Sequence, residues 1–148
     1  MPSEALIQPI RTLLQETVRA CGGAEAAYWE LAEDGTSLVA AVNAGPAPAR
    51  LEGLRVPIDG SLVGMVLCTG MATALGPDGA YHPAAREATG IRTGAMAAAP
   101  VRVMGRAAGV LSIINPLGRE LFSAEDLAQV QRRALLLGRL LEGAGHAS

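Results

Sequence analysis

Apolar residues recur three or four positions apart over residues 3–20, and this spacing predicts an amino-terminal helix. Ser3 can cap the start of this helix, and Gly22 marks its end. Pro9 interrupts the pattern because it lacks a backbone N–H and disfavours helical geometry at the preceding residue. The helix therefore either begins near Pro9 or kinks there.

Short apolar stretches bounded by turn residues predict a sheet after this helix. The expected strands cover residues 25–32, 37–44, 55–58, 72–75, 93–103 and 106–115. Asp34-Gly35 is a tight-turn signal between the first two strands, and Met104-Gly105 joins the last two. Pro100 cannot donate a ladder hydrogen bond, so it predicts a sheet edge or a bulge at its position.

Two further helices follow from their caps. Ser61 precedes an apolar run that ends at Gly70, which predicts a short helix. Ser123 and Asp126 resemble a capping box with Asp in place of the usual Glu. They are expected to open a long helix over residues 123–142.

The remaining stretch, residues 76–92, mixes proline, glycine and charged residues without a period. It predicts a long loop with one helical turn near residues 84–89, and long loops in compact domains are often functional. The order of elements is typical of an α+β domain in which helices gather mainly on one face of an antiparallel sheet. We expect a single domain over residues 1–148, with a core at about 4–142 and a flexible tail at 143–148.

Composition narrows the classes of function. The net charge is −2 and no basic block occurs, which argues against a nucleic-acid-binding face and a polybasic membrane anchor. No apolar run reaches the ~18 residues of a spanning helix, and the start has no signal-peptide pattern. All twelve basic residues are arginine, which excludes lysine chemistry such as a Schiff base. We therefore expect a cytoplasmic protein that binds neither nucleic acid nor membrane.

The two cysteines, Cys21 and Cys68, have neither Cys-x-x-Cys spacing nor a histidine at ligand spacing. This pattern predicts no metal site. The simplest interpretation is two buried thiols in a reducing compartment.

Five motifs, taken in order along the chain, resemble the GAF domain family, and the resemblance covers nearly the whole chain. They are the Gly-Ser helix start in Val56–Gly64, the Thr-Gly helix exit in Cys68–Ala72, the strand motif Ala99–Val101, the hairpin Gly105 with Gly109–Leu111, and the closing Asn115 with Phe122–Leu127. The helix exit departs from the family pattern, because Ala72 stands where proline is frequent. The resemblance implies a GAF- or PAS-like antiparallel sheet of about five or six strands. It also implies that the first and last helices pack on one face, with the short helix and the long loop over the other.

The resemblance also implies a ligand pocket between the sheet, the short helix and the long loop. Its candidate wall consists of Trp29, Ser61, Met65, Tyr81, His82, Arg86, Thr93 and Met96. Arg86 or Arg92 would pair with an anionic group, which the start of the short helix also favours. Trp29 and Met65 are equally consistent with plain core residues, and Ser61 with a helix cap. The ligand stays unknown, and no cofactor is identified.

The catalytic and cofactor signatures of the family are incomplete in this chain. Residues 76–104 contain no cysteine, which disfavours a methionine-sulfoxide-reductase-like enzyme and leaves a redox sensor using Cys68 as a weak alternative. No cysteine lies near His82, which disfavours a covalent bilin, and a lone loop histidine is usually solvated rather than bound to haem. Asn115 is followed by Pro116, so the cyclic-nucleotide signature is also incomplete. We therefore expect no enzymatic activity.

The last helix carries a heptad-like apolar seam, and in GAF proteins the first and last helices commonly pair into a dimeric bundle. The expected homodimer interface contains Leu6, Ile10, Leu13, Val130, Leu137 and Leu141. The sequence thus predicts a bacterial-type sensory module that binds a small molecule or a signalling protein partner and acts through helix packing in a dimer. The main alternative is a dimeric scaffold without a ligand.

Overall fold

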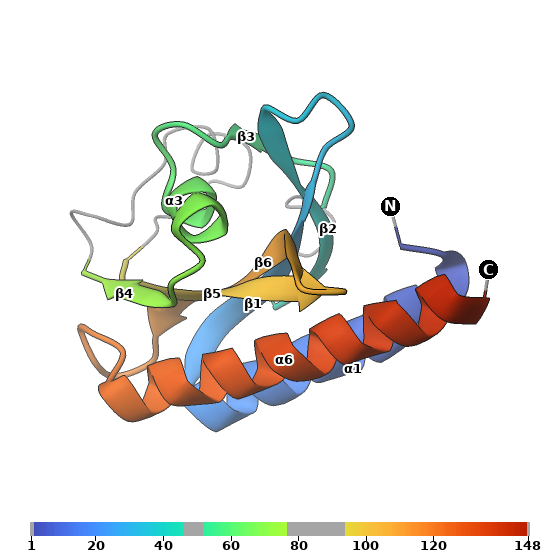
Figure 1. The fold of residues 1–148 in the computed structure, drawn as a ribbon. Helices are drawn as coiled ribbons and strands as arrows, with labels where there is room; N and C mark the ends of the chain where they lie inside the picture. Colours follow the sequence, from blue (N-terminus) through green and yellow to red (C-terminus); the bar gives the residue numbers. More distant parts are fainter. Residues whose placement is uncertain (1, 46–51, 77–93, 148) are drawn as a thin grey trace.

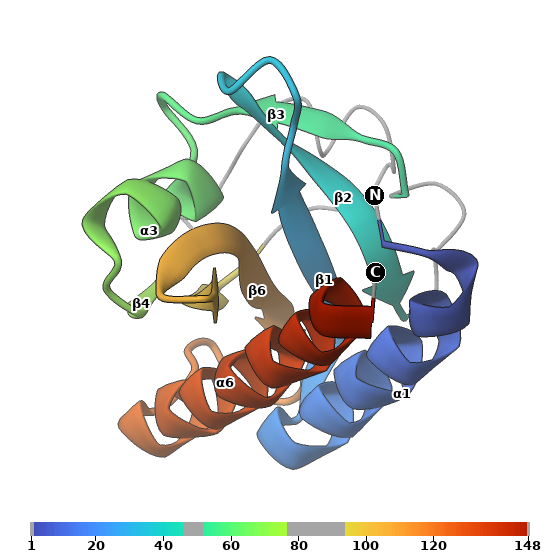
Figure 2. The same ribbon diagram turned by 45° about the vertical axis from the view of Figure 1, so that its right-hand side comes forward.

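The computed structural model describes residues 2–45, 52–76 and 94–147, with only the backbone for residues 144–147. In chain order the elements are α1 (Glu4–Cys21), β1 (Gly23–Leu31), β2 (Ser37–Ala44), β3 (Arg55–Pro57), α3 (Leu62–Thr69), β4 (Thr73–Leu75), β5 (Met96–Val103), β6 (Arg106–Pro116) and α6 (Ala124–Ala147). Helices α1 and α6 lie side by side on one face of the sheet, and α3 lies on the other (Figures 1 and 2). The predicted α+β architecture is therefore confirmed.

The six strands form one sheet in the order β3-β2-β1-β6-β5-β4, and every neighbouring pair is antiparallel. Met104 and Gly105 join β5 to β6 with φ angles of 54° and 79°. Two central residues with positive φ form the turn that matches the twist of a two-residue hairpin. Pro100 lies beyond the end of β4, which pairs only with residues 96–98 of β5. The predicted edge at this proline is confirmed.

Side chains of alternate residues along each strand divide the core into two layers. In β1, Ala26 and Tyr28 face the helix pair, whereas Ala27 and Trp29 face α3. Burial raises the pKa of Tyr28 well above its ordinary value, and the nearby Glu30 raises it further. Tyr28 is therefore an uncharged core residue of the layer beneath α1 and α6.

Gly109 of β6 allows β1 and β6 to pack closely. A Cβ atom at this position would lie 2.2 Å from the main-chain oxygen of Trp29 and 2.7 Å from the ring of Tyr28. No side chain fits at such distances, so this close pairing of β1 with β6 requires glycine at position 109.

Helix α1 begins at Glu4 and continues through Pro9. Ser3 occupies the N-cap position, but its side chain makes no capping hydrogen bond. Gly22 ends the helix in the left-handed conformation, with its N–H donating to the oxygen of Val18. The sequence left open whether the helix begins after Ser3 or near Pro9, and the structure shows that it begins after Ser3.

Both hydrogen bonds of the predicted capping box of α6 are present, so that prediction is confirmed. The Asp126 N–H donates to Ser123 Oγ (3.1 Å), and the Ser123 N–H donates to Asp126 Oδ2 (2.8 Å). Arg119 donates to the same carboxylate oxygen (2.7 Å). The helix then continues to Ala147, so residues 143–147 of the expected flexible tail are helical.

All six residues of the expected dimer interface are used within one chain. Ile10, Val130 and Leu137 are fully buried in the core beneath the helix pair, while Leu6, Leu13 and Leu141 pack against that core. The heptad-like seam therefore holds α1 and α6 on their own sheet. Homodimerisation and its interface stay predictions, and among these six residues Leu6, Leu13 and Leu141 are partly exposed.

Within the described residues, none of the helices combines the length and apolar character that a bilayer crossing requires.

We predict that Asp126→Asn lowers the free energy of unfolding by about 1 kcal/mol at neutral pH, because it weakens the cap of α6. Burial alone would raise the pKa of Asp126, but the hydrogen bonds from Ser123 and Arg119 outweigh burial and lower that pKa. A carboxyl with a lowered native pKa stabilises the fold above its unfolded pKa of about 4 and loses this contribution as the pH falls through its native pKa.

Urea denaturation at neutral and acidic pH measures this contribution, with Glu125→Gln as the control in the same helical turn. The difference between wild type and Asp126→Asn should shrink on acidification. A difference that persists at low pH, or an equal loss in the control, would contradict the role of the cap.

Candidate functional site

Helix α3 is held over the sheet by its first turn. Ser61 Oγ accepts a hydrogen bond from the Gly64 N–H (3.1 Å) and donates to the Pro57 oxygen (2.6 Å). A Cβ atom at Gly64 would lie 1.8 Å from the main-chain oxygen of Ile58, so only glycine allows this approach. The hydroxyl of Ser61 is therefore fully used in capping, as the plainer interpretation of this residue predicted.

The predicted pocket wall is only partly assembled by the described structure. Trp29 and Met96 both lie in the buried cluster beneath α3. Met65 instead lies exposed on α3, outside that cluster. The remaining predicted wall residues, Tyr81, His82, Arg86 and Thr93, lie outside the described residues, as does Arg92.

A row of five paired positions crosses the sheet on the α3 face. In sheet order these positions are Asn43, Ala27, Ser112, Ala98 and Thr73. The pairing sets the two polar side chains of β2 and β6 on either side of a single alanine. The two alanines of this row, Ala27 and Ala98, belong to the buried cluster beneath α3.

Trp29 is anchored to this row by a hydrogen bond. Its indole Nε1–H donates to Ser112 Oγ at 2.9 Å, and both residues are buried. A buried indole N–H needs such a partner, because leaving it unpaired costs about 1–3 kcal/mol. The bond fixes the plane of the chain's single tryptophan against the sheet.

The side chain of Asn43, unlike those of Trp29 and Ser112, has no hydrogen-bond partner in the described structure. Its side chain is fully buried, and neither Nδ2 nor Oδ1 has a hydrogen-bond partner in the described structure. Its neighbours Val42 and Ala44 face the helix pair, and it pairs with Ala27, so its amide points to the α3 face. Because buried amides are nearly always hydrogen-bonded, this unpaired amide is an exception that marks a candidate binding position.

The main chain of Asn43 is tied to α1. Arg11 Nε donates to the Asn43 oxygen (3.3 Å), and the Asn43 N–H donates to Glu52 Oε1 (3.1 Å). Arg11 and Glu52 also form an ion pair that is part-buried. These bonds provide partners for the main-chain groups of Asn43, which lies beyond the residues of β2 that pair with β3. They also connect the strand that carries Asn43 to helix α1 on the opposite face of the sheet.

The two cysteines differ in environment, which corrects the expectation that both are buried. Cys21 is buried in the helix layer, and burial, aided by Asp126, raises the pKa of its thiol to about 11. Cys68 lies exposed on α3. No disulfide joins them, and no cluster of metal-ligating side chains occurs among the described residues.

Asn115, part of the closing sequence motif, has a structural role. It adopts a positive φ of 60° near the end of β6, and its side-chain oxygen accepts a hydrogen bond from the Gly94 N–H. Asparagine tolerates this backbone conformation better than most residues. This part of the motif therefore holds the chain just before β5 against the end of β6.

The sequence analysis did not identify Asn43 and Ser112 as site residues, although the sequence contains a signal for them. Asn43 is the one amide in the otherwise largely apolar segment SLVAAVNA, and Ser112 interrupts the apolar run of β6. A polar residue inside a buried strand is the informative exception in such patterns.

Comparison with known proteins gives a clear result for the fold. The family model for the GAF domain matches residues 5–141. The GAF-B domain of DevS from Mycobacterium smegmatis has a TM-score of 0.74 at 20% identity, with 95% of each chain covered. The GAF domain of a phosphoenolpyruvate-protein phosphotransferase from Coxiella burnetii has a TM-score of 0.80 at 19% identity, covering 98% of this chain and 87% of that one.

An enzyme is also among the similar structures. The free methionine-R-sulfoxide reductase from Neisseria meningitidis, in complex with its substrate, has a TM-score of 0.75 at 19% identity, covering 96% of this chain and 81% of that one. Comparison with curated proteins gave no match. At these identities the structural likeness establishes the fold and leaves the ligand open.

We predict that Asn43→Val raises the free energy of unfolding of the ligand-free chain by about 1 kcal/mol, because it removes an unpaired buried amide. Ser112→Ala should lower it by a similar amount, because the Trp29 N–H loses its acceptor. Urea denaturation of chains refolded from denaturant measures both. A destabilised Asn43→Val variant would mean that the amide is satisfied within the protein and has a structural role.

Proposed function

The chain belongs to the GAF domain family, and on that premise we propose that it is a sensory module whose α3 face binds a small polar molecule. GAF domains are generally sensory or regulatory modules. The observation that carries the proposal is the unpaired, fully buried amide of Asn43 beside the Trp29–Ser112 pair. A ligand with a hydrogen-bond donor or acceptor would satisfy that amide and regain its desolvation cost.

The proposed output runs through the helix pair. A ligand that moves Asn43 also moves the main-chain groups that Arg11 and Glu52 hold. Arg11 belongs to α1, and α1 packs on α6, where Arg133 donates to Glu16 (2.8 Å). Ligand binding at one face of the sheet would thus bias helix packing at the other, because ligands shift equilibria between conformations that they bind differently.

A catalytic role is less well supported. The sulfoxide reductase has the same fold, but here the buried Cys21 has a raised thiol pKa, and thiols react as thiolates. Cys68 is then the remaining candidate for a reactive thiol, and residues 69–148 contain no second cysteine that could form a disulfide with it. We therefore propose a non-enzymatic cytoplasmic module. A ligand-free scaffold is the alternative.

Homodimerisation through α6 is part of the proposal. Leu136 is 47% exposed and follows Arg133, the residue that reaches α1, by three positions on the same side of the helix. A second copy would cover this leucine without disturbing the core beneath it. The interface proposed here lies next to the seam, of which Ile10, Val130 and Leu137 are buried within one chain.

Native mass spectrometry of the freshly purified chain tests the ligand. We expect an extra mass that disappears on denaturation, that is lost or reduced in Asn43→Val, and that is retained in Cys68→Ser. A wild-type chain without added mass would favour the scaffold. An added mass that survives in Asn43→Val would place the ligand elsewhere, and one lost only in Cys68→Ser would favour thiol chemistry.

Light scattering tests the dimer. We expect Leu136→Glu to give monomers that remain folded, because this leucine is 47% exposed and lies outside the buried core. Leu117→Glu, at another exposed leucine, should leave the assembly unchanged. Persistence of the dimer in Leu136→Glu would refute the proposed interface, whereas Leu137→Glu should unfold the chain because Leu137 is fully buried.

A further inference from the structure

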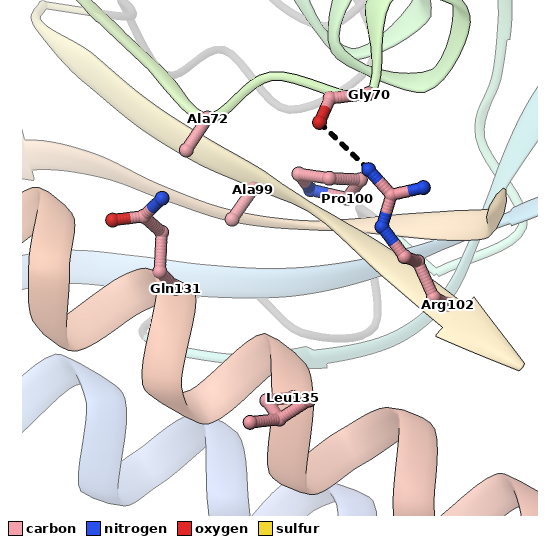
Figure 3. Close-up of a pocket in the computed structure, with 7 residues that line it drawn as sticks. All are labelled: Gly70, Ala72, Ala99, Pro100, Arg102, Gln131 and Leu135. Carbon is pink, nitrogen blue, oxygen red and sulfur yellow. Dashed lines mark hydrogen bonds between the residues drawn. The ribbon is translucent and has the colours of Figure 1, made fainter. Parts of the chain in front are cut away.

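A second surface feature lies away from the α3 face, where β5 passes α6. A groove of about 250 Å³ is lined by Ala72, Ala99, Pro100, Arg102, Gln131 and Leu135 (Figure 3). Its apolar side includes Leu135, which is 58% exposed. An exposed leucine beside an apolar floor is a favourable contact for another molecule.

The floor of the groove is an open sheet edge. On that side β4 pairs with β5 only at residues 96–98, so from Ala99 onward β5 is paired only with β6 among the described strands. Pro100 removes one N–H from this edge, and the main chain of Arg102 lies against Gly138 of α6, so a partner would be held here mainly by side-chain contacts. The edge is short and lies next to the groove, which fits one or two residues of a partner rather than a whole added strand.

Arg102 provides the charged group of the groove. Its Nη2 donates to the Gly70 oxygen at the end of α3 (2.8 Å), which holds the guanidinium at the rim (Figure 3). Its main chain is fixed by α6, because a Cβ atom at Gly138 would lie 2.3 Å from the Arg102 oxygen. A guanidinium has five N–H donors, so a carboxylate can still bind to those that Gly70 does not use.

Arg102 is the charged residue among the described groove-lining residues, and α6 adds Arg132 next to Gln131 and Arg139 four positions after Leu135. Between Asp126 and Glu142, α6 carries three arginines and no acidic residue. Arg133 is paired with Glu16, but no ion pair of Arg102, Arg132 or Arg139 occurs among the described residues. The carboxylate of Glu142 accepts a hydrogen bond from the Met104 N–H. In a chain with a net charge of −2, this local excess of arginine favours an acidic partner.

We propose that this groove docks an extended acidic segment of a partner protein. An aliphatic side chain of the segment packs between Leu135 and Ala99, and a neighbouring carboxylate binds Arg102. Between Asp126 and Glu142, α6 has no acidic residue, so a second copy that met this groove through its own groove would offer no carboxylate to Arg102 from this stretch. This site is separate from the α3 face and does not require a small ligand there.

The test uses the full chain and two synthetic peptides with acetylated and amidated ends. The acidic probe is Asp-Glu-Val-Leu-Glu-Asp, and the control has lysine at each acidic position. In ¹⁵N-resolved NMR we expect the acidic peptide to shift the amides of residues 99–103 and 131–135, and the lysine peptide to leave them unchanged. Arg102→Glu and Leu135→Asp should each weaken binding about tenfold. The matched controls Arg19→Glu and Leu117→Asp should leave it unchanged.

Several results would overturn the proposal. One is the absence of shifts at the groove with the acidic peptide, and another is equal binding of the lysine peptide. A third is binding of the wild-type chain to phosphatidylglycerol vesicles that Arg102→Glu abolishes while the peptide stays unbound, which would make the surface a lipid contact. A fourth is a dimer that Leu135→Asp dissociates, which would make it an interface between copies.

Discussion

The antiparallel pairing of β1 with β6 is the constraint on which the rest of this structure depends. It joins the two halves of the sheet, and it is close because Gly109 leaves room for the main chain of Trp29 and the ring of Tyr28. Tyr28 then projects into the helix layer and Trp29 into the α3 layer, where Ser112 of β6 accepts its indole hydrogen bond. The pairing of β1 with β6 thus positions the tyrosine of one core layer, the tryptophan of the other, and the candidate site beside that tryptophan.

Much of this fold could be predicted from local signals in the sequence. The caps at Ser61 and Ser123 and the turn at Met104-Gly105 act within a few residues, so each can be recognised without knowing the tertiary structure. The role of the heptad-like seam could not be recognised in this way. An apolar stripe has the same spacing whether it covers its own sheet or a second chain, and only the packing of Val130 and Leu137 decides between them.

The candidate site was harder to predict for a related reason. Helical and strand periods indicate which residues are buried, but they do not give the register that brings Asn43 and Ser112 into one row. Of the pocket wall that the resemblance to GAF domains implies, Trp29 and Met96 lie in the buried cluster beneath α3, whereas Met65 lies exposed on that helix, and the wall itself stays a prediction. Whether a polar group lacks a partner is a property of the folded structure, so the unpaired amide of Asn43 could only appear there.

The central claim is that a small molecule binds beside the Asn43–Ser112 row. The most direct measurement uses the indole N–H of Trp29, the only tryptophan of the chain, as a reporter in that row. The dialysable fraction of a cell extract is added to the ¹⁵N-labelled chain, and the indole resonance is followed by NMR. The account predicts that this resonance shifts, and that the shift is lost in Asn43→Val. An indole resonance that does not move with any fraction of the extract would contradict it.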